Sequence, residues 1–204
     1  MPKLAGLLGA HCTGKTTLMQ HLSELYDITM IPFSVSEVFK KHGIPTNEKL
    51  DFANRLNIQN TLLDAYEATL EYYLENHGSE HFIIDRTPLD FLAYTYADIV
   101  AGEELSDEES HSFSNYVKSC YALTEKYFTH ITLIQPGVPL EDREGRGFMG
   151  IHYIDKINLM MIGSLTMLHP SAEVDVKVMP RDCIDFEERS HAMRRTLTEL
   201  GFMD

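Results

Sequence analysis

The feature that most constrains this chain is a glycine-bounded segment at residues 9–16, with the sequence Gly-Ala-His-Cys-Thr-Gly-Lys-Thr. A short apolar run at residues 4–8 precedes it, and a pattern typical of a helix follows it. A strand, a glycine-bounded loop ending in Gly-Lys-Thr and a helix, in this order, form the context that a phosphate-binding P-loop requires. A chance match in an ordinary strand–turn–helix connection is the alternative. The segment predicts a nucleotide phosphate site at the end of the first strand.

Each residue type in this loop has a chemical task. Glycines such as Gly9 and Gly14 let backbone N–H groups curl around phosphate oxygens, and the helix N-terminus adds partial positive charge. Lys15, expected on an exposed loop, can reach the outer phosphates, and the Thr16 hydroxyl can hold Mg²⁺. We therefore expect ATP and Mg²⁺ as cofactors. The other expected nucleotide contacts in and after the loop are His11, Cys12, Thr13 and Thr17.

The order of apolar segments predicts the fold class. Strands are expected at 3–9, 27–33, 81–86, 131–134 and 174–178, and helices at 15–26, 36–42, 46–76, 88–101, 106–126, 153–168 and 186–200. Strands that alternate with helices indicate a parallel sheet covered on both faces. The sequence predicts one α/β domain over residues 1–204, with the three-layer fold of P-loop NTPases, a five-stranded parallel sheet and an arginine-bearing lid at about 136–150.

Two of these helices begin with recognisable caps. Thr87 suits the N-cap position, Pro88 suits the first helical position, and Asp90 favours a helix start. Ser106 and Glu109 have the spacing of a capping box. Both patterns predict helices that begin directly after these residues.

Charged residues follow the carboxyl ends of the predicted strands, where ligands bind in open α/β sheets. The residues placed there are Glu37 after the second strand, Asp85 and Arg86 after the third, Arg143 and Arg146 after the fourth, and Arg181 after the last. We expect them to meet the P-loop at one edge of the sheet, where a phosphate donor and an acceptor would lie. Arg181 is expected to contact the nucleotide.

The residue types suggest individual roles. Asp85 has the position of a Walker-B-type carboxylate that holds Mg²⁺, or else it caps the next helix. Arg86 could clamp the acceptor or the transferring group, because guanidinium matches phosphate oxygens, or it could pair with a neighbouring carboxylate. Glu37 could accept the proton of an attacking hydroxyl or bind a sugar hydroxyl, or it could simply face solvent.

Two further groups remain open. Arg143 and Arg146 lie in a glycine-rich loop that suits a lid closing over the phosphates, although surface arginines look the same. Arg55, Gln59 and Asn60 lie on the long helix and are expected to contact the base or sugar of an acceptor, unless they are only exposed helix residues.

Four segments together resemble small P-loop kinases. They are Gly-Ala-His-Cys-Thr-Gly-Lys-Thr-Thr-Leu at the P-loop, the Glu37 segment, Phe-Ile-Ile-Asp-Arg-Thr-Pro-Leu-Asp-Phe-Leu-Ala-Tyr at 82–94, and Pro-Gly-Val-Pro-Leu-Glu-Asp-Arg-Glu-Gly-Arg at 136–146. The similarity is to the ribosylnicotinamide kinase domain of bacterial NAD-synthesis regulators, related AAA-like ATPases and viral deoxynucleotide kinases. It covers nearly the whole chain, and Asp-Arg-Thr-Pro combined with the lid is its most specific part.

The resemblance implies roles for these residues. Lys15 and Thr16 would serve ATP and Mg²⁺, Asp85 would serve catalysis, Arg86 the acceptor and the lid arginines the transition state. The lid departs from the Asp-Gly-x-Arg pattern expected of the group, because residues 141–146 read Glu-Asp-Arg-Glu-Gly-Arg. Either lid arginine could therefore act.

Composition bears on partners and location. A formal net charge of −14 opposes binding to nucleic acid or an acidic membrane surface. Three cysteines far apart in the sequence suit a reducing cytoplasm, and no apolar run approaches the roughly 20 residues that span a bilayer. An apolar face on the long helix would serve a core or a homodimer.

These observations favour ATP- and Mg²⁺-dependent phosphoryl transfer to a small acceptor, namely a nucleoside, a nucleotide (a deoxynucleotide included) or a related molecule. One alternative is a kinase that acts on a hydroxyl or modified base in nucleic acid. The other is a nucleotide-dependent ATPase or switch that has no small acceptor.

Overall fold

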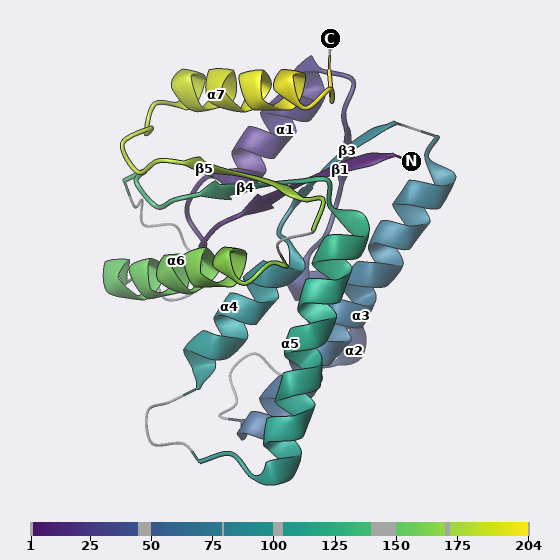
Figure 1. The fold of residues 1–204 in the computed structure, drawn as a ribbon, viewed down its shortest axis with the longest axis vertical. Helices are drawn as coiled ribbons and strands as arrows, with labels where there is room; N and C mark the ends of the chain where they lie inside the picture. The colour runs from purple at the N-terminus through teal and green to yellow at the C-terminus, as the bar shows by residue number, and fades with distance from the viewer. Residues whose placement is uncertain are drawn as a thin grey trace.

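The computed structural model describes residues 2–44, 50–78, 80–99, 104–139, 150–169 and 172–203. Within these ranges, one sheet contains β1 (Lys3–Leu8), β2 (Thr29–Ile31), β3 (His81–Asp85), β4 (His130–Ile134) and β5 (Asp175–Met179). The helices are α1 (Lys15–Leu25), α2 (Val35–His42), α3 (Phe52–Asn76), α4 (Pro88–Asp98), α5 (Asp107–Tyr127), α6 (Ile151–Thr166) and α7 (Phe186–Glu199). Figure 1 shows their arrangement.

The strands lie in the order β2-β3-β1-β4-β5, and every pairing is parallel. The central strand β1 is buried along most of its length, as an apolar strand covered on both faces should be. Its Leu7 pairs in register with Asp85 of β3. Because both strands point the same way, the loop after β1 and the residues after β3 emerge side by side at one edge of the sheet.

Helices cover both faces of the sheet and make two separate cores (Figure 1). On one face, α1 and α7 pack with Leu18, Leu22 and Leu197 against β1 and β3. On the other face lie α3, α4, α5 and α6, with Tyr66 and Leu92 among their buried side chains. The predicted three-layer α/β fold with a five-stranded parallel sheet is therefore confirmed for the described residues.

Both predicted helix caps are present. The Asp90 carboxylate accepts hydrogen bonds from the Thr87 N–H, at 2.6 Å, and from the Thr87 hydroxyl, at 3.1 Å. Ser106 and Glu109 form the expected reciprocal box, in which Glu109 N–H donates to the serine oxygen at 3.2 Å. These local interactions stop the preceding segments and start α4 and α5.

Several predicted boundaries were wrong by a few residues, and two of them have a clear structural reason. The long helix begins at Phe52 instead of residue 46, because Asp51 adopts an extended conformation and accepts the Asn54 N–H at 2.8 Å as the N-cap. The second strand ends at Ile31, and Phe33 leaves it to pack edge-on against Tyr66, with ring centroids 5.0 Å apart.

Among the described residues, no helix combines the length and the apolar character needed to cross a membrane.

Candidate active site

The P-loop connects β1 to α1 in a backbone conformation that its glycines allow. Gly14 lies at φ 78° directly before α1. A Cβ at Gly9 would lie 2.7 Å from the carbonyl oxygen of Ile134, closer than real side chains come, so only glycine fits there. The Thr13 hydroxyl donates to the Ala10 carbonyl at 2.9 Å and closes the loop on itself. The loop is thus built around two positions that favour glycine.

Lys15 lies inside this loop and is buried, which corrects the expectation of an exposed position. Its ammonium donates to the carbonyls of Gly9 at 2.5 Å and Ala10 at 3.0 Å, and it lies 3.8 Å from Oδ1 of Asp85. Burial lowers the pKa of Lys15, and the neighbouring Asp85 carboxylate opposes that shift. The loop and the third strand thus hold a cation where phosphate oxygens are expected to bind.

Asp85 and Thr16 supply the oxygen ligands that Mg²⁺ prefers. The Thr16 hydroxyl donates to Oδ2 of Asp85. Oδ1 of Asp85 is buried and has no hydrogen-bond partner among the described residues, so it has lone pairs free for a ligand. A hydroxyl and a carboxylate beside a phosphate site fit Mg²⁺, which uses few protein ligands and keeps several waters. The structure describes no group of three or more His, Cys, Asp or Glu side chains that could hold a metal by themselves.

Arg86 follows β3 in a left-handed backbone conformation, with φ 96°. Its N–H donates to the Leu7 carbonyl at 3.1 Å, and its carbonyl accepts from the Tyr66 hydroxyl at 2.9 Å. Such a conformation costs a non-glycine residue on the order of 1–3 kcal/mol and persists only where the surroundings enforce it. Here two long-range hydrogen bonds enforce it, and they fix where the guanidinium enters the cavity.

Asp90 ties α4 to the P-loop as well as capping the helix. One of its oxygens accepts the Gly9 N–H at 3.4 Å, in addition to the bonds from Thr87. The side chain is completely buried, and desolvation raises its pKa to about 6, while Lys15 and Arg86 oppose that shift. Sequence reasoning identified only the capping role of Asp90, because the contact with Gly9 spans distant parts of the chain.

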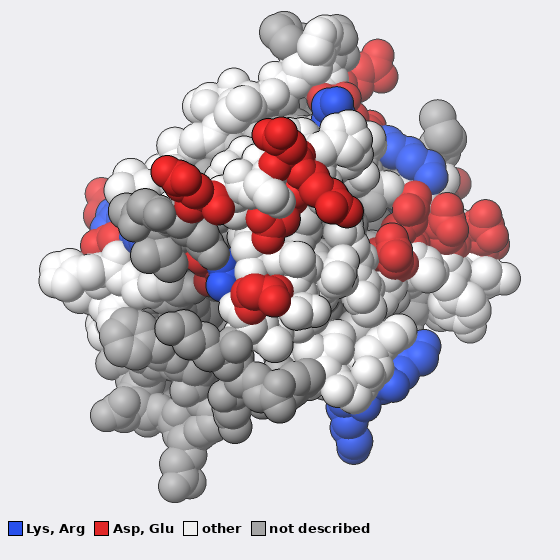
Figure 2. Space-filling view, turned by 90° about the horizontal axis from the view of Figure 1, so that it is seen from below, with Lys and Arg blue, Asp and Glu red and all other residues white. Residues whose placement is uncertain are grey.

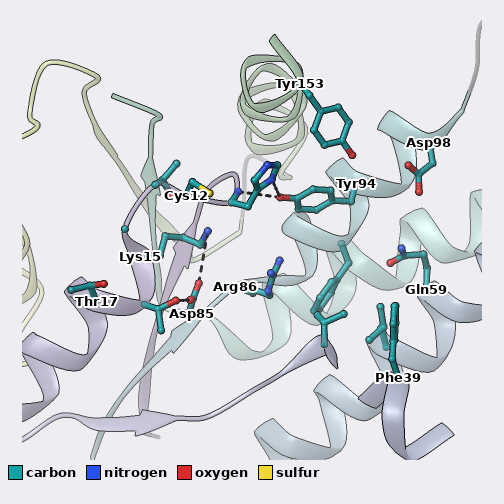
Figure 3. A pocket seen from close by; sticks show the side chains of 17 residues that line it. Cys12, Lys15, Thr17, Phe39, Gln59, Asp85, Arg86, Tyr94, Asp98 and Tyr153 are labelled. Carbon is teal, nitrogen blue, oxygen red and sulfur yellow. Dashed lines mark hydrogen bonds and ion pairs between the residues drawn. The ribbon is translucent and has the colours of Figure 1, made fainter. Parts of the chain in front are cut away.

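A cavity of about 700 Å³ begins at the P-loop and extends between α2, α3 and α4. Figure 3 shows Cys12, Lys15 and Asp85 at one end, Arg86 in the middle, and Gln59 and Asp98 at the other end. The residues that line it are His11, Cys12, Thr13, Gly14, Lys15, Thr16, Thr17, Val35, Phe39, Gln59, Leu62, Asp85, Arg86, Phe91, Tyr94, Asp98 and Tyr153. Phosphate-binding groups and an aromatic chamber thus share one continuous space.

One ring and two polar side chains define the end that is distant from the P-loop. Phe39 lines it (Figure 3), and Oε1 of Gln59 is buried there without a hydrogen-bond partner among the described residues. Asp98 adds an exposed carboxylate at this end (Figure 3), whereas the Tyr153 ring lies near the P-loop, with its centroid 5.9 Å from that of His11. This combination suits a flat ring that can stack and can donate a hydrogen bond to Gln59 or Asp98.

Tyr94 links the two ends of the cavity. Its hydroxyl accepts the backbone N–H of His11 at 3.1 Å and lies 3.0 Å from Nδ1 of the same histidine (Figure 3). Burial raises the pKa of Tyr94 to about 12, so its hydroxyl stays protonated at neutral pH. The P-loop is therefore fastened to α4 through a neutral hydroxyl.

Most predicted site residues come together in this cavity, but not all. Glu37 is exposed on α2, where its N–H donates to the Ser34 hydroxyl at 3.3 Å, and it does not line the cavity. Arg55 donates to the Leu50 carbonyl at 2.9 Å and is also absent from the lining. Arg181 forms an ion pair with Asp155 at 2.6 Å, and neither residue lines the cavity.

Three more predicted residues lie elsewhere. Asn60 turns back along α3, where its amide donates to the Leu56 carbonyl at 3.1 Å. Arg143 and Arg146, together with most of the predicted lid, lie outside the described residues.

Several functional candidates were missed from the sequence. Tyr94, Asp98 and Tyr153 lie on helices whose pattern indicated ordinary packing, although Tyr94 closes the 82–94 segment of the resemblance. Arg189 contacts the P-loop from the last helix, and nothing in its local sequence distinguishes it from a surface arginine.

Comparisons with known proteins agree with this geometry. A family model described as an AAA domain matches residues 6–128. No curated protein sequence matches the chain significantly.

Solved kinase structures share the fold. The chain is similar to deoxyadenosine kinase from M. mycoides with bound dCTP, at 13% identity and TM-score 0.65, over 96% of this chain and 99% of that one. It is similar to thymidylate kinase from Candida albicans, at 12% identity and TM-score 0.61, over 100% of this chain and 94% of that one. The NadR protein in complex with NR gives 15% identity and TM-score 0.64, over 97% of this chain and 50% of that one. These matches confirm the predicted resemblance to P-loop nucleotide kinases at the level of the fold.

Proposed function

This chain belongs to the AAA-domain family, and we propose that it is an ATP- and Mg²⁺-dependent kinase of a nucleoside, a nucleotide or a related small acceptor. The observation that carries the proposal is the continuous cavity of about 700 Å³. Its P-loop end suits a triphosphate, its aromatic end suits a flat ring, and Arg86 lies between them. The shared fold with nucleoside and nucleotide kinases supports the same reading.

Different residues of the cavity would perform different parts of the phosphoryl transfer. The P-loop amides and Lys15 would bind and orient the phosphates of ATP. Thr16 and Asp85 would hold Mg²⁺, which would supply positive charge to neutralise the phosphates. Arg86 would stabilise charge on the transferring group, because its guanidinium lies between the two ends of the cavity.

Asp85 is also the better candidate for the group that accepts the proton of the attacking hydroxyl. It lines the cavity, whereas Glu37 is exposed outside it. A general base must lie within hydrogen-bond reach of the hydroxyl it deprotonates, directly or through one water. Of the two carboxylates, we therefore prefer Asp85 for this role, as the alternative to its ligation of Mg²⁺, and assign none to Glu37.

The acceptor we propose is a small molecule. A cavity lined by Phe39, Phe91 and Gln59 has the size and lining of a small-molecule site. Figure 2 shows that acidic side chains outnumber basic ones on the visible face, and the described residues form no continuous basic stripe there. With a formal net charge of −14, such a surface disfavours a nucleic acid acceptor.

An acceptor screen tests this proposal. ADP production would be followed with ATP and Mg²⁺ in the presence of nucleosides, ribonucleoside and deoxyribonucleoside monophosphates, and an oligonucleotide. We expect at least one small acceptor to raise ADP production well above the background of ATP alone, and Lys15→Ala to remove that increase. Stimulation by the oligonucleotide alone, or by no acceptor, would contradict the proposal.

Gln59→Leu provides a matched variant for the acceptor end. It should raise the KM for the acceptor and leave the KM for ATP nearly unchanged, because Gln59 lies at the end of the cavity distant from Lys15. An equal rise in both KM values would contradict the division of the cavity into a donor end and an acceptor end.

A further inference from the structure

Arg189 of α7 is a buried arginine in direct contact with the P-loop. Its side chain is 4% exposed, and its Nη2 donates to the Thr13 carbonyl at 2.6 Å. Its Nε lies 3.4 Å from the sulfur of Met179 at the end of β5. The guanidinium is thus fixed between the last strand, the last helix and the phosphate-binding loop.

Among the described residues, Arg189 forms no ion pair with a carboxylate, and the acidic group that acts on its charge is the Cys183 thiol, whose own pKa is raised by burial. The ion pairs found there join Lys15 to Asp85, Lys126 to two glutamates and Arg181 to Asp155, and none of them includes Arg189. Burial lowers the pKa of Arg189, as expected for a charge removed from water. An ion buried without a partner is costly, and this cost falls when an opposite charge binds nearby.

The guanidinium lies beside the anion-binding end of α1. A Cβ added to Gly14 would lie 3.0 Å from Nη1 of Arg189, so the cation packs directly against the residue that starts the helix. A phosphate at this helix N-terminus would feel both the helix dipole and the buried guanidinium. In a water-poor setting, charge interactions over several ångströms remain strong.

From these contacts we infer that Arg189 is a positioning residue of the nucleotide site, whose charge selects ligands with several phosphates. Its hydrogen bond to Thr13 fixes the backbone of the loop, and its buried charge is compensated by the phosphates of the bound nucleotide. This inference rests on the proposed binding of ATP at the P-loop. It goes further, because it assigns part of the affinity for polyphosphates to the C-terminal helix.

Three substitutions separate the charge of Arg189 from its hydrogen bond. Arg189→Lys keeps the charge, Arg189→Gln keeps a donor without charge, and Arg189→Met keeps only apolar volume. Arg195→Met, an exposed residue on the same helix, controls for the loss of one positive charge from the whole protein. Dissociation constants would be measured by titration for ATP, tripolyphosphate and adenosine, and unfolding midpoints would be recorded without ligand.

We expect Arg189→Gln and Arg189→Met to weaken binding of ATP and tripolyphosphate by about tenfold or more, consistent with loss of a partly desolvated charge contact. The dissociation constants of Arg189→Lys for ATP and tripolyphosphate should stay within about threefold of those of the unmodified protein. Arg195→Met should bind both ligands as tightly as the unmodified protein. Adenosine binding should be unchanged in every variant. Without ligand, Arg189→Gln should unfold no earlier than Arg189→Lys, because it buries no charge.

Two results would overturn the inference. Arg189→Gln could bind ATP as tightly as the unmodified protein, which would leave Arg189 a structural role only. Equal loss for ATP and adenosine in all three variants would likewise show general damage to the site. If the unmodified protein bound neither ATP nor tripolyphosphate, the proposed function itself would fail, and this outcome is distinct from the other two.

Discussion

At the level of single residues, the cavity contains two non-glycine residues with left-handed backbones. Cys12 lies at φ 62° in the P-loop, and Arg86 lies at φ 96° after β3. Both positions are unfavourable for residues with a side chain, and both line the cavity. We interpret this coincidence as backbone strain that the fold accepts in order to aim groups at the ligands.

Arg86 gives the first residue-level prediction. Arg86→Ala should leave ATP affinity nearly unchanged and lower the rate of phosphoryl transfer on the order of 10²–10³-fold, because an interaction made mainly in the transition state affects turnover. The check is an ATP titration beside steady-state kinetics with the best acceptor. A switch protein would instead show altered ATP affinity in this variant, since it has no acceptor to clamp.

Cys12 gives the second prediction. Its half-buried thiol lines the nucleotide end of the cavity, so bound ATP should slow its alkylation by iodoacetamide, and alkylated protein should no longer bind ATP. Labelling would be followed by peptide mass spectrometry. Cys12→Ser is the control, because it removes the thiol in the cavity lining and should still bind ATP after iodoacetamide treatment. Equal rates at Cys12 under both conditions would refute the prediction.

At the level of elements, short sequence patterns predicted the helix caps and strands that depend on interactions between neighbouring residues. The cap at Thr87 and the box at Ser106 were readable because each closes within three residues. The cap at Asp51 acts over the same span but was missed, because helix-favouring residues before it concealed the boundary. Apolar runs located the strands for a similar reason, since each buried strand must supply its own apolar side chains.

Contacts between residues far apart in the sequence could not be predicted from such local patterns. The Tyr94 hydroxyl meets His11 over 83 positions, and Arg189 meets Thr13 over 176. A tyrosine or arginine on an amphipathic helix has the same local pattern whether it packs or binds. For the same reason, the rule that charges follow strand ends placed Asp85 and Arg86 correctly, whereas Glu37 faces solvent outside the cavity.

The strand β4 gives the element-level prediction. His130 at its start is completely buried, and burial lowers its pKa from 6.5 to about 4. The unfolded chain therefore binds a proton more readily than the folded one between these values. The contribution of neutral His130 to the free energy of unfolding should be complete above about pH 6.5. It should be lost as the pH falls toward 4, by up to about 3 kcal/mol.

The variant His130→Gln isolates this effect, because Asp90, whose raised pKa acts in the opposite direction, is present in both proteins. Urea unfolding at pH values from 7 to 4 should show the unmodified protein losing stability relative to the variant. Parallel stability curves over this range would rule out His130 as the source.

At the level of the whole molecule, two cores separate the tasks of the protein. The core under α1 and α7 supports the P-loop and holds Arg189 against it. The helices on the other side of the sheet, α2, α3, α4 and α6, supply the walls of the cavity beyond the P-loop. The P-loop and the residues after β3 lie at the carboxyl edge of the sheet, between the two helical layers. One layer therefore supports the donor end of the cavity, and the other supports the acceptor end. The fold class was predictable from the sequence because it depends on the order of strands and helices, whereas the acceptor end depends on how four helices pack.

The central claim is that phosphate passes from ATP to an acceptor within one cavity, and product stoichiometry tests it most directly. ADP and phosphorylated acceptor would be quantified in the same reaction by mass spectrometry, with Lys15→Ala as the inactive control. We expect equal amounts of the two products, and neither product above background in the control. ADP formed in step with free phosphate, at a rate that no acceptor changes, would contradict this expectation and identify the protein as an ATPase or switch.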